Sequence, residues 1–314
     1  MLGGMPERPT SPGRRDWMLA QPTRIEAALA RSQRLPSGGW FVVGSTGAMR
    51  ARSKPKRLMI NGHELVAWNA SGGQGLFVAP AACPHLGADL SCGRVEGDLI
   101  ICPWHGLALG AEGHGRWKPH PVHDDGVLVW ARLDDDASTV TETPILAPRP
   151  IRAINAVITR EANCEPEDII ANRLDPWHGV HLHPYAFSKL EVTNESDEAL
   201  EVDVTYRFAG RFGVPVKARF HCPDPRTIVM TITDGEGTGS VVETHATPLI
   251  RADQAGGPRT AIIEATLATS DRPGFAYARR VAPAVRPIIR LLASRLWTDD
   301  TRYAERRYAV RRGA

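Results

Sequence analysis

Cys83-Pro84-His85 and Cys102-Pro103-Trp104-His105-Gly106 decide the fold of the first half of this chain. Each stretch supplies one cysteine and one histidine. Two thiolates and two imidazoles in this order are the ligands of a [2Fe–2S] cluster in which histidine replaces cysteine on one of the two irons. A zinc site would more often pair C-x-x-C with a second C-x-x-C or with H-x-x-x-H. The pattern therefore predicts an iron–sulfur cluster with the ligands Cys83, His85, Cys102 and His105.

The residues around these two stretches alternate between short apolar runs and turns. Runs at 58–60, 65–68 and 76–78 precede the first stretch, and further runs lie within 93–101 and 126–130. Short apolar runs bounded by Asn-Gly and Gly-Gly turns are typical of antiparallel strands. Over about residues 38 to 133 the chain resembles Rieske proteins, and this resemblance implies a small all-β domain around the cluster.

Length and charge exclude several other classes. A chain of 314 residues with 42% hydrophobic residues can build two domains with substantial cores. Its net charge of +3 comes from interspersed acids and bases, so nucleic-acid binding is not expected. No apolar run is long enough to cross a bilayer, so we expect no transmembrane segment and a cytoplasmic location. Residues 1–37 are expected to form a flexible N-terminal segment with a short helix over 23–32.

A second histidine-rich stretch lies between Asn172 and Tyr185. Within it, Asp175, His178 and His183 follow the pattern D-x-x-H-x-x-x-x-H. A mononuclear iron(II) site of the oxygenase kind needs two neutral imidazoles and one carboxylate on one face of the metal, which leaves the other face open. The spacing alone is a weak signal, but downstream of a cluster motif it indicates a mononuclear Fe(II) site.

With both motifs considered, the chain resembles the terminal oxygenase (α-subunit) family of Rieske non-haem iron oxygenases, in particular its compact, ketosteroid hydroxylase-like type. The resemblance implies that His178 and His183 bind the mononuclear iron. It also implies that Asp175 bridges a cluster histidine of one subunit to an iron histidine of its neighbour. Asn172 occupies the position of a polar residue that lies near the iron in this family.

His181 is the alternative to His183. It follows His178 at an i, i+3 spacing, which can also chelate a metal on a helix. The longer gap to His183 is the commoner one in the family that the chain resembles, so His183 is preferred.

The third iron ligand is expected in a long helix over 284–311. Asp300 lies one helical turn beyond the apolar residues of this helix, so it would extend a buried stripe. A carboxylate on such a stripe is costly unless it is paired or binds a metal. Asp300 is therefore the predicted ligand, and Asp299, rotated by about 100° on the helix, is the alternative. The apolar residues expected to form the stripe are Ile288, Ile289, Leu292, Leu296 and Trp297.

The segment between these ligands alternates apolar and polar residues, notably over 200–208, 228–232 and 261–268. Such alternation predicts antiparallel strands with one buried face. We therefore predict an α+β chain. An N-terminal all-β Rieske [2Fe–2S] domain over 38–148 precedes a helix-grip (START-like) catalytic domain over 149–314, which has an antiparallel sheet and a long C-terminal helix.

The resemblance implies a terminal oxygenase of a mono- or dioxygenase system that uses O2 to hydroxylate or dealkylate a small hydrophobic substrate, either aromatic or terpenoid-like (a steroid or carotenoid). Because the sequence holds no flavin or nicotinamide fingerprint, a separate NAD(P)H-dependent reductase should supply the electrons, directly or through a ferredoxin. A homotrimer is expected. The alternative is a Rieske electron-transfer protein fused to a non-catalytic ligand-binding helix-grip domain.

Overall fold

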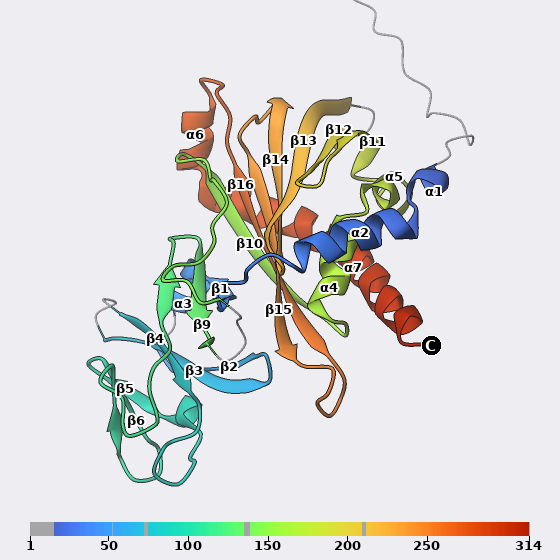
Figure 1. Ribbon diagram of the computed structural model, residues 1–314. Helices are drawn as coiled ribbons and strands as arrows, with labels where there is room; N and C mark the ends of the chain where they lie inside the picture. The colour runs from blue at the N-terminus through green and yellow to red at the C-terminus, as the bar shows by residue number, and fades with distance from the viewer. Residues whose placement is uncertain (1–15, 52, 72–74, 135–138, 209–211, 314) are drawn as a thin grey trace, which may run out of the picture.

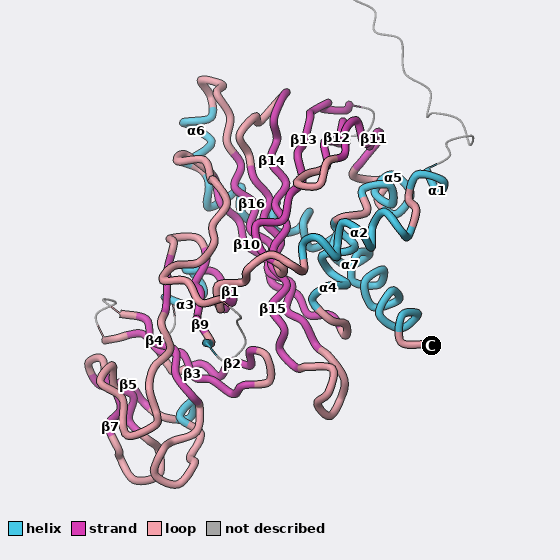
Figure 2. The backbone as a smooth tube through the Cα atoms, in the orientation of Figure 1, coloured by secondary structure: helices cyan, strands magenta, loops and turns pink. Residues whose placement is uncertain are grey.

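A computed structural model describes residues 16–51, 53–71, 75–134, 139–208 and 212–313 of the chain. It contains two domains, a small β domain and a larger domain in which helices cover one sheet (Figures 1 and 2). Residues 1–15 of the segment expected to be flexible lie outside the described residues. No described helix is long and apolar enough to cross a bilayer.

The N-terminal domain is built from three small antiparallel sheets, with the strand orders β1-β9-β8, β2-β3-β4 and β5-β6-β7. The predicted cluster stretches are the loops after β4 and after β6, at one end of this domain. The elements are β1 (Trp40–Ser45), α3 (Thr46–Arg50), β2 (Lys56–Ile60), β3 (His63–Asn69), β4 (Leu76–Pro80), the 3-10 turn η1 (Leu90–Cys92), β5 (Arg94–Glu96), β6 (Leu99–Ile101), β7 (Ala108–Leu109), β8 (Val122–Asp124) and β9 (Leu128–Arg132).

The C-terminal domain has a seven-stranded antiparallel sheet with the strand order β10-β16-β15-β14-β13-β12-β11. A long final helix packs along β10, and a shorter helix, α4, packs against the final helix and β15. The elements are β10 (Ile154–Ala162), α4 (Pro166–Arg173), the 3-10 turn η3 (Pro176–His178), α5 (Gly179–Leu182), β11 (Phe187–Glu195), β12 (Leu200–Phe208), β13 (Phe212–Asp224), β14 (Thr227–Gly235), β15 (Val241–Ile250), β16 (Arg259–Ala268), α6 (Phe275–Arg280) and α7 (Ala282–Arg311).

This architecture confirms the predicted fold class, an all-β domain followed by an antiparallel sheet gripped by a long C-terminal helix. The alternating segments form strands because one side of each strand faces the helices. Val202 and Val204 of β12 are buried there in one hydrophobic core with Ile262 of β16. Trp297, completely buried, fills the space between α7 and the sheet.

The N-terminal segment belongs to the larger domain. After α1 (Asp16–Leu19), helix α2 (Pro22–Ser32) buries Ile25 and Leu29 in the same core as α4 and the large sheet. Figure 1 shows both helices (blue) beside α4, α5 and α7, away from the small β domain. The short helix expected over 23–32 corresponds to α2, whose apolar side covers that core.

The predicted buried stripe of the C-terminal helix is wrong in its first half. Ile288 and Leu292 are each 59% exposed. The helix instead packs on the sheet through a different face, rotated away from these residues. Most side chains of that face are small, so the helix lies close to β10. Asp300 lies on this buried face, as predicted. The buried residues of α7 are Ala282, Ala293, Trp297, Asp300 and Ala304.

A buried ionic network joins the two domains. Arg149, in the connection between them, donates to both carboxylate oxygens of Glu243 on β15 at 2.6 Å, and its Nη1 lies 2.8 Å from Asp125 beside β9. His245 Nε2 lies 3.3 Å from Glu243 Oε2. Burial alone would raise the pKa of Glu243, but the hydrogen bonds from His245 and Arg149 lower it to about 2. The two domains are thus held together by a desolvated charge network as well as by apolar contacts.

Replacing Glu243 with Gln should destabilise the protein by about 3 kcal/mol at pH 7, because it leaves Arg149 buried with a single carboxylate partner. The pKa of Glu243 is depressed in the folded protein, so its contribution is complete above its usual value of 4.5 and is lost as pH falls toward about 2. The free energies of unfolding of wild type and variant, measured with urea, should therefore become equal as pH falls over that interval. Glu161→Gln, which breaks the exposed pair with Arg259, is the control and should have little effect. A difference in the free energy of unfolding that stays constant down to pH 2 would contradict the assignment of a depressed pKa to Glu243.

Candidate functional site

The two predicted cluster loops have the same backbone geometry. In each loop the glycine that closes the turn donates its amide to the cysteine carbonyl, Gly87 to Cys83 at 2.8 Å and Gly106 to Cys102 at 3.1 Å. Both glycines have positive φ, 78° and 72°, a conformation that side chains disfavour. The glycines therefore allow two tight turns that present the cluster motifs side by side.

The four predicted cluster ligands gather at one end of the small domain. Cys83 and Cys102 are buried in the hydrophobic cluster that includes Trp68 and Leu90, whereas His85 and His105 are exposed, with ring centroids 4.8 Å apart. This donor set fits a [2Fe–2S] cluster whose cysteine-bound iron is shielded and whose histidine-bound iron faces the surface. An electron-transfer partner would therefore approach from the histidine side.

In the larger domain, His178, His183 and Asp300 converge from three different elements. His178 ends η3, His183 follows α5, and Asp300 comes from the middle of α7. Asp300 Oδ1 lies 3.2 Å from His178 Nε2 and 2.8 Å from His183 Nε2. One ligand atom from each residue lies within 4.8 Å of the other two. The structure thus brings together two imidazoles from one short stretch and a carboxylate that lies more than 115 residues later, at separations of 122 and 117 residues.

The surroundings of His183 indicate that a cation belongs among these three residues. Tyr185 donates its hydroxyl proton to Asp299 Oδ2 at 2.8 Å, so it can only accept from His183 Nδ1, 3.2 Å away. A neutral His183 then directs the lone pair of Nε2 at the carboxylate of Asp300, which is 1% exposed. Two acceptors at 2.8 Å repel one another unless a proton or a metal ion lies between them. Such outer hydrogen bonds are the usual means of orienting a metal-binding histidine.

Electrostatics at the triad also favour a bound cation. Burial would raise the pKa of Asp300, but hydrogen bonds with His178 and His183 hold it well below its usual range. Burial would lower the pKa of His178, but the nearby carboxylate of Asp175 and the hydrogen bond with Asp300 raise it to about 9. In the metal-free protein a proton therefore takes the place of the ion at neutral pH, and metal binding must release it.

Asp175 and Asn172 lie next to this triad. Asp175 Oδ2 accepts a hydrogen bond from Tyr303 at 2.9 Å and lies 3.8 Å from His178 Nδ1. Asn172 donates its side-chain amide to Asp300 Oδ1 at 3.2 Å. Oδ1 of Asp175 and Oδ1 of Asn172 are buried without a hydrogen-bond partner among the described residues. The geometry fits the predicted positions of both residues, while their roles stay predictions.

The two alternative ligands lie outside the triad. The side chain of His181 is 62% exposed, and its Nε2 lies 3.1 Å from Asp16 Oδ2 of the N-terminal helix. Asp299 faces Tyr185 behind His183 rather than the centre of the site. If a metal binds here, the geometry favours His183 and Asp300 over these alternatives.

Sequence reasoning missed a buried carboxylate on the sheet that holds the ligand helix in place. Glu264 of β16 accepts hydrogen bonds from Trp297 Nε1 at 2.8 Å and from Arg173 Nη2 at 2.9 Å. Burial raises the pKa of Glu264 despite this cation. A lone acid within the apolar run 261–265 was the available signal, because a buried charge requires a partner. Tyr303, one turn after Asp300, was missed in the same way.

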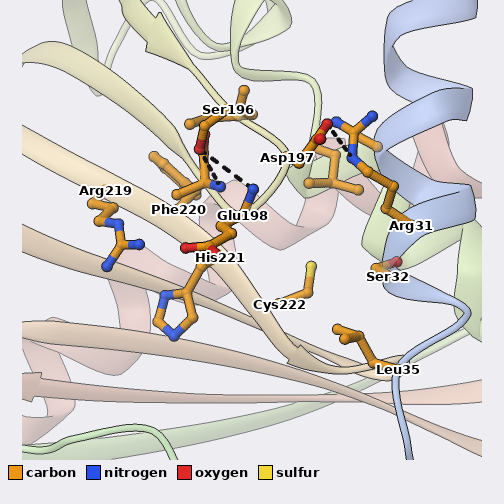
Figure 3. A pocket seen from close by; sticks show the side chains of 14 residues that line it. Arg31, Ser32, Leu35, Ser196, Asp197, Glu198, Arg219, Phe220, His221 and Cys222 are labelled. Carbon is orange, nitrogen blue, oxygen red and sulfur yellow. Dashed lines mark hydrogen bonds and ion pairs between the residues drawn. The ribbon is translucent and has the colours of Figure 1, made fainter.

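A cavity of about 280 Å³ opens elsewhere on this domain, between α2, the β11–β12 turn and β13 (Figure 3). Arg31 from α2 faces Asp197 across it, 3.5 Å away, above a largely apolar floor. None of the triad residues lines this cavity, so it is separate from the chemistry described above.

Comparison with known proteins agrees with this architecture. Residues 39–133 match the model of the Rieske [2Fe-2S] domain, and residues 135–314 match a family described as "Domain of unknown function (DUF5914)". The oxygenase component of a 3-ketosteroid-9-alpha-monooxygenase from Rhodococcus rhodochrous is 28% identical over 48% of this chain and 42% of its own. A 5,5'-dehydrodivanillate O-demethylase oxygenase subunit from Sphingobium sp. is 33% identical over 30% of this chain and 26% of its own. The chain thus spans less than half the length of these curated relatives.

Two solved structures share the fold over most of the chain. Dicamba monooxygenase bound to dicamba superposes with a TM-score of 0.62, covers 88% of both chains and is 17% identical. The terminal oxygenase of carbazole 1,9a-dioxygenase from Novosphingobium sp. KA1 superposes with a TM-score of 0.59, covers 95% of this chain and 90% of its own, and is 15% identical. At these identities the likeness establishes the fold.

His183→Ala should abolish binding of one Fe(II) per chain, because two donors remain where three converge, while the iron and sulfide of the cluster stay unchanged. His181→Ala, on the same loop but turned toward Asp16, is the matched control and should retain all of the iron. Metal analysis, acid-labile sulfide and the visible spectrum of the anaerobically purified variants measure both. Loss of the mononuclear iron in His181→Ala but not in His183→Ala would identify His181, rather than His183, as the iron ligand.

Proposed function

We propose that this chain, which belongs to the DUF5914 family and carries a Rieske [2Fe-2S] domain ahead of the family segment, is the terminal oxygenase component of a Rieske-type mono- or dioxygenase. The observation that carries the proposal is the convergence of His178, His183 and Asp300 in a chain that also holds a cluster motif. Two imidazoles and a carboxylate suit non-haem Fe(II), and the remaining coordination positions suit dioxygen and substrate.

In this proposal His178, His183 and Asp300 hold the mononuclear iron, which when bound supplies the activation of dioxygen beside the substrate. Tyr185 fixes the tautomer of His183 by accepting from its Nδ1. Asn172 orients the Asp300 carboxylate through its side-chain amide. Each of these residues sets the direction of a ligand atom before the metal arrives, so the site needs little rearrangement to bind it.

Asp175 is the residue we propose to connect the two metal sites. Its Oδ2 faces His178 Nδ1, and Tyr303 holds the carboxylate in that direction. Oδ1 of Asp175 has no hydrogen-bond partner among the described residues, although it is buried in the single chain. In this proposal an exposed cluster histidine of a second subunit, His85 or His105, carries the ring N–H that pairs with the Asp175 carboxylate. A homotrimer in which each cluster passes electrons to the mononuclear iron of a neighbouring subunit accounts for this arrangement.

The substrate proposed is a small hydrophobic ring compound of the aromatic, steroid or carotenoid-like kind, since the similar proteins are named for a 3-ketosteroid and for a dehydrodivanillate. Electrons would come from a separate NAD(P)H-dependent reductase, directly or through a ferredoxin. A cytoplasmic location suits this reductant and the reduced state of the cysteines among the described residues.

Metal stoichiometry with spectroscopy tests the proposal. The wild type should contain about three irons and two acid-labile sulfides per chain, and His178→Ala about two irons with the cluster EPR signal retained. The chemically reduced wild type should then incorporate 18O from 18O2 into an added ketosteroid or related ring compound in a single turnover. Two irons in both proteins would instead leave an electron-transfer protein fused to a ligand-binding domain.

Asp175→Asn should keep both metal centres and lower turnover by about 10- to 100-fold, because the amide cannot bridge two imidazole N–H groups as a carboxylate does. Rapid-freeze EPR of the reduced protein mixed with O2 and substrate should show slow reoxidation of the cluster. Tyr303→Phe, which keeps the carboxylate and removes only its hydrogen bond, is the graded control with a smaller loss. Normal cluster reoxidation in Asp175→Asn would rule out the bridging role.

A further inference from the structure

The cavity beside α2 exists because one strand of the large sheet runs past its neighbour. Leu200 at the beginning of β12 pairs with Phe220, but β13 continues to Asp224. The turn over 196–199, which joins β11 to β12, therefore leaves a notch beside the last residues of β13, and α2 packs next to it. Successive side chains of a strand point to opposite faces, so residues from both faces of β13 line this cavity (Figure 3).

Two buried nitrogen atoms of the cavity residues lack hydrogen-bond partners. They are Nε of Arg31 and Nδ1 of His221. Among the described residues, the other buried side-chain atoms without a partner belong to Asn172, Asp175 and His178, at or beside the triad. Buried polar groups of native proteins are rarely left unpaired, so each exception needs an explanation. At the triad that explanation is a group from outside the chain, and the same explanation fits the cavity.

No described residue gives Arg31 Nε a hydrogen-bond acceptor. Oδ1 of Asp197 lies 3.5 Å from this nitrogen, which is longer than the roughly 2.7–3.2 Å of an N–H···O hydrogen bond. The Asp197 side chain is 89% exposed on the β11–β12 turn, so it can stay in water when another anion reaches the guanidinium. A carboxylate that enters the cavity would supply the acceptor that the buried Nε lacks.

The remainder of the cavity suits an apolar body. Burial raises the pKa of the Cys222 thiol to about 12, so this side chain stays neutral. Burial and the nearby charge of Arg219 lower the pKa of His221, so its imidazole is neutral at pH 7 and can make one polar contact through Nδ1. Sites for small molecules usually measure about 300–1,000 Å³, so this cavity suits a molecule at the small end of that range. The apolar residues that line it are Ala28, Leu35, Leu174, Ala199, Leu200 and Phe220.

We propose that the cavity between α2, the β11–β12 turn and β13 binds a small apolar carboxylic acid. The carboxylate pairs with Arg31, and the hydrocarbon body lies on the apolar floor. Figure 3 shows Arg31 and His221 on different sides of Cys222, so a polar group at the other end of the ligand can meet His221. This is a second binding site beside the proposed oxygenase site, since no triad residue lines it. Leu174 lines the cavity and directly precedes Asp175, so a bound acid contacts the segment that leads to the proposed iron ligands.

Isothermal titration calorimetry of the full-length, metal-loaded protein with octanoate and with 3-phenylpropionate tests this. Each acid should bind more tightly than its uncharged primary amide, because the amide cannot form the ion pair. Arg31→Gln should weaken binding of the acids at least about tenfold and remove the preference for acid over amide. Arg34→Gln changes an exposed arginine just after α2 that does not line the cavity, so this matched control should bind like the wild type.

Cys222→Phe fills the cavity with an apolar ring and should abolish binding of acids and amides alike, while unchanged cluster spectra show that folding is intact. His183→Ala should bind both acids as the wild type does, because the cavity is separate from the triad. Three results would overturn the proposal: no binding of either acid to the wild type, unchanged binding in Arg31→Gln or Cys222→Phe, or loss of acid binding in His183→Ala. The last would place the acid at the proposed iron site. None of them changes the iron and sulfide content on which the proposed oxygenase function is tested.

Discussion

The carboxylate of Asp300 is the constraint on which the larger domain depends. It is buried in the middle of a 30-residue helix and faces two imidazole nitrogens, so its charge must be balanced at that point. A proton on His178 can provide the balance, and so can a metal ion. The packing of α7 against the sheet, the loop that carries the histidines and the outer hydrogen bonds all keep these three donor atoms together. The metal preference of the site follows from that donor set rather than from the fold.

Two buried networks fix the position of α7 on the sheet, and with it the position of Asp300. Close to the site, Glu264 holds Trp297 and Arg173, which tie the ligand helix to β16 and to the helix before the histidine loop. At the far end, Arg307 and Arg311 bond to Asp168 at the beginning of α4. Both networks join α4 to α7, the two elements that lead to the donor atoms. Removing either one would leave a buried charge unpaired, so the geometry of the site is coupled to the stability of the domain.

The sequence predicted what local patterns can encode. Cysteine and histidine spacing identified the cluster loops, and alternation of apolar and polar residues identified the strands. The choice of Asp300 rested on a stripe that was partly wrong, since Ile288 and Leu292 are exposed, yet Asp300 and Trp297 do share the buried side of the helix. Which side of a helix is covered depends on partners distant in the sequence. The role of Glu264 and the packing of α2 were missed for the same reason, as each depends on contacts made only after folding.

The placement of α2 has a consequence for the order of folding. Helix α2 completes a core whose other buried members follow the small β domain, so that domain is topologically an insertion between two parts of one fold. During synthesis α2 emerges early and must remain without its partners until α4 and the large sheet have left the ribosome. Long-range closure of this kind raises contact order and slows folding. Meanwhile the inserted domain can fold as a unit, so the cluster could be assembled in a chain whose second domain is still incomplete.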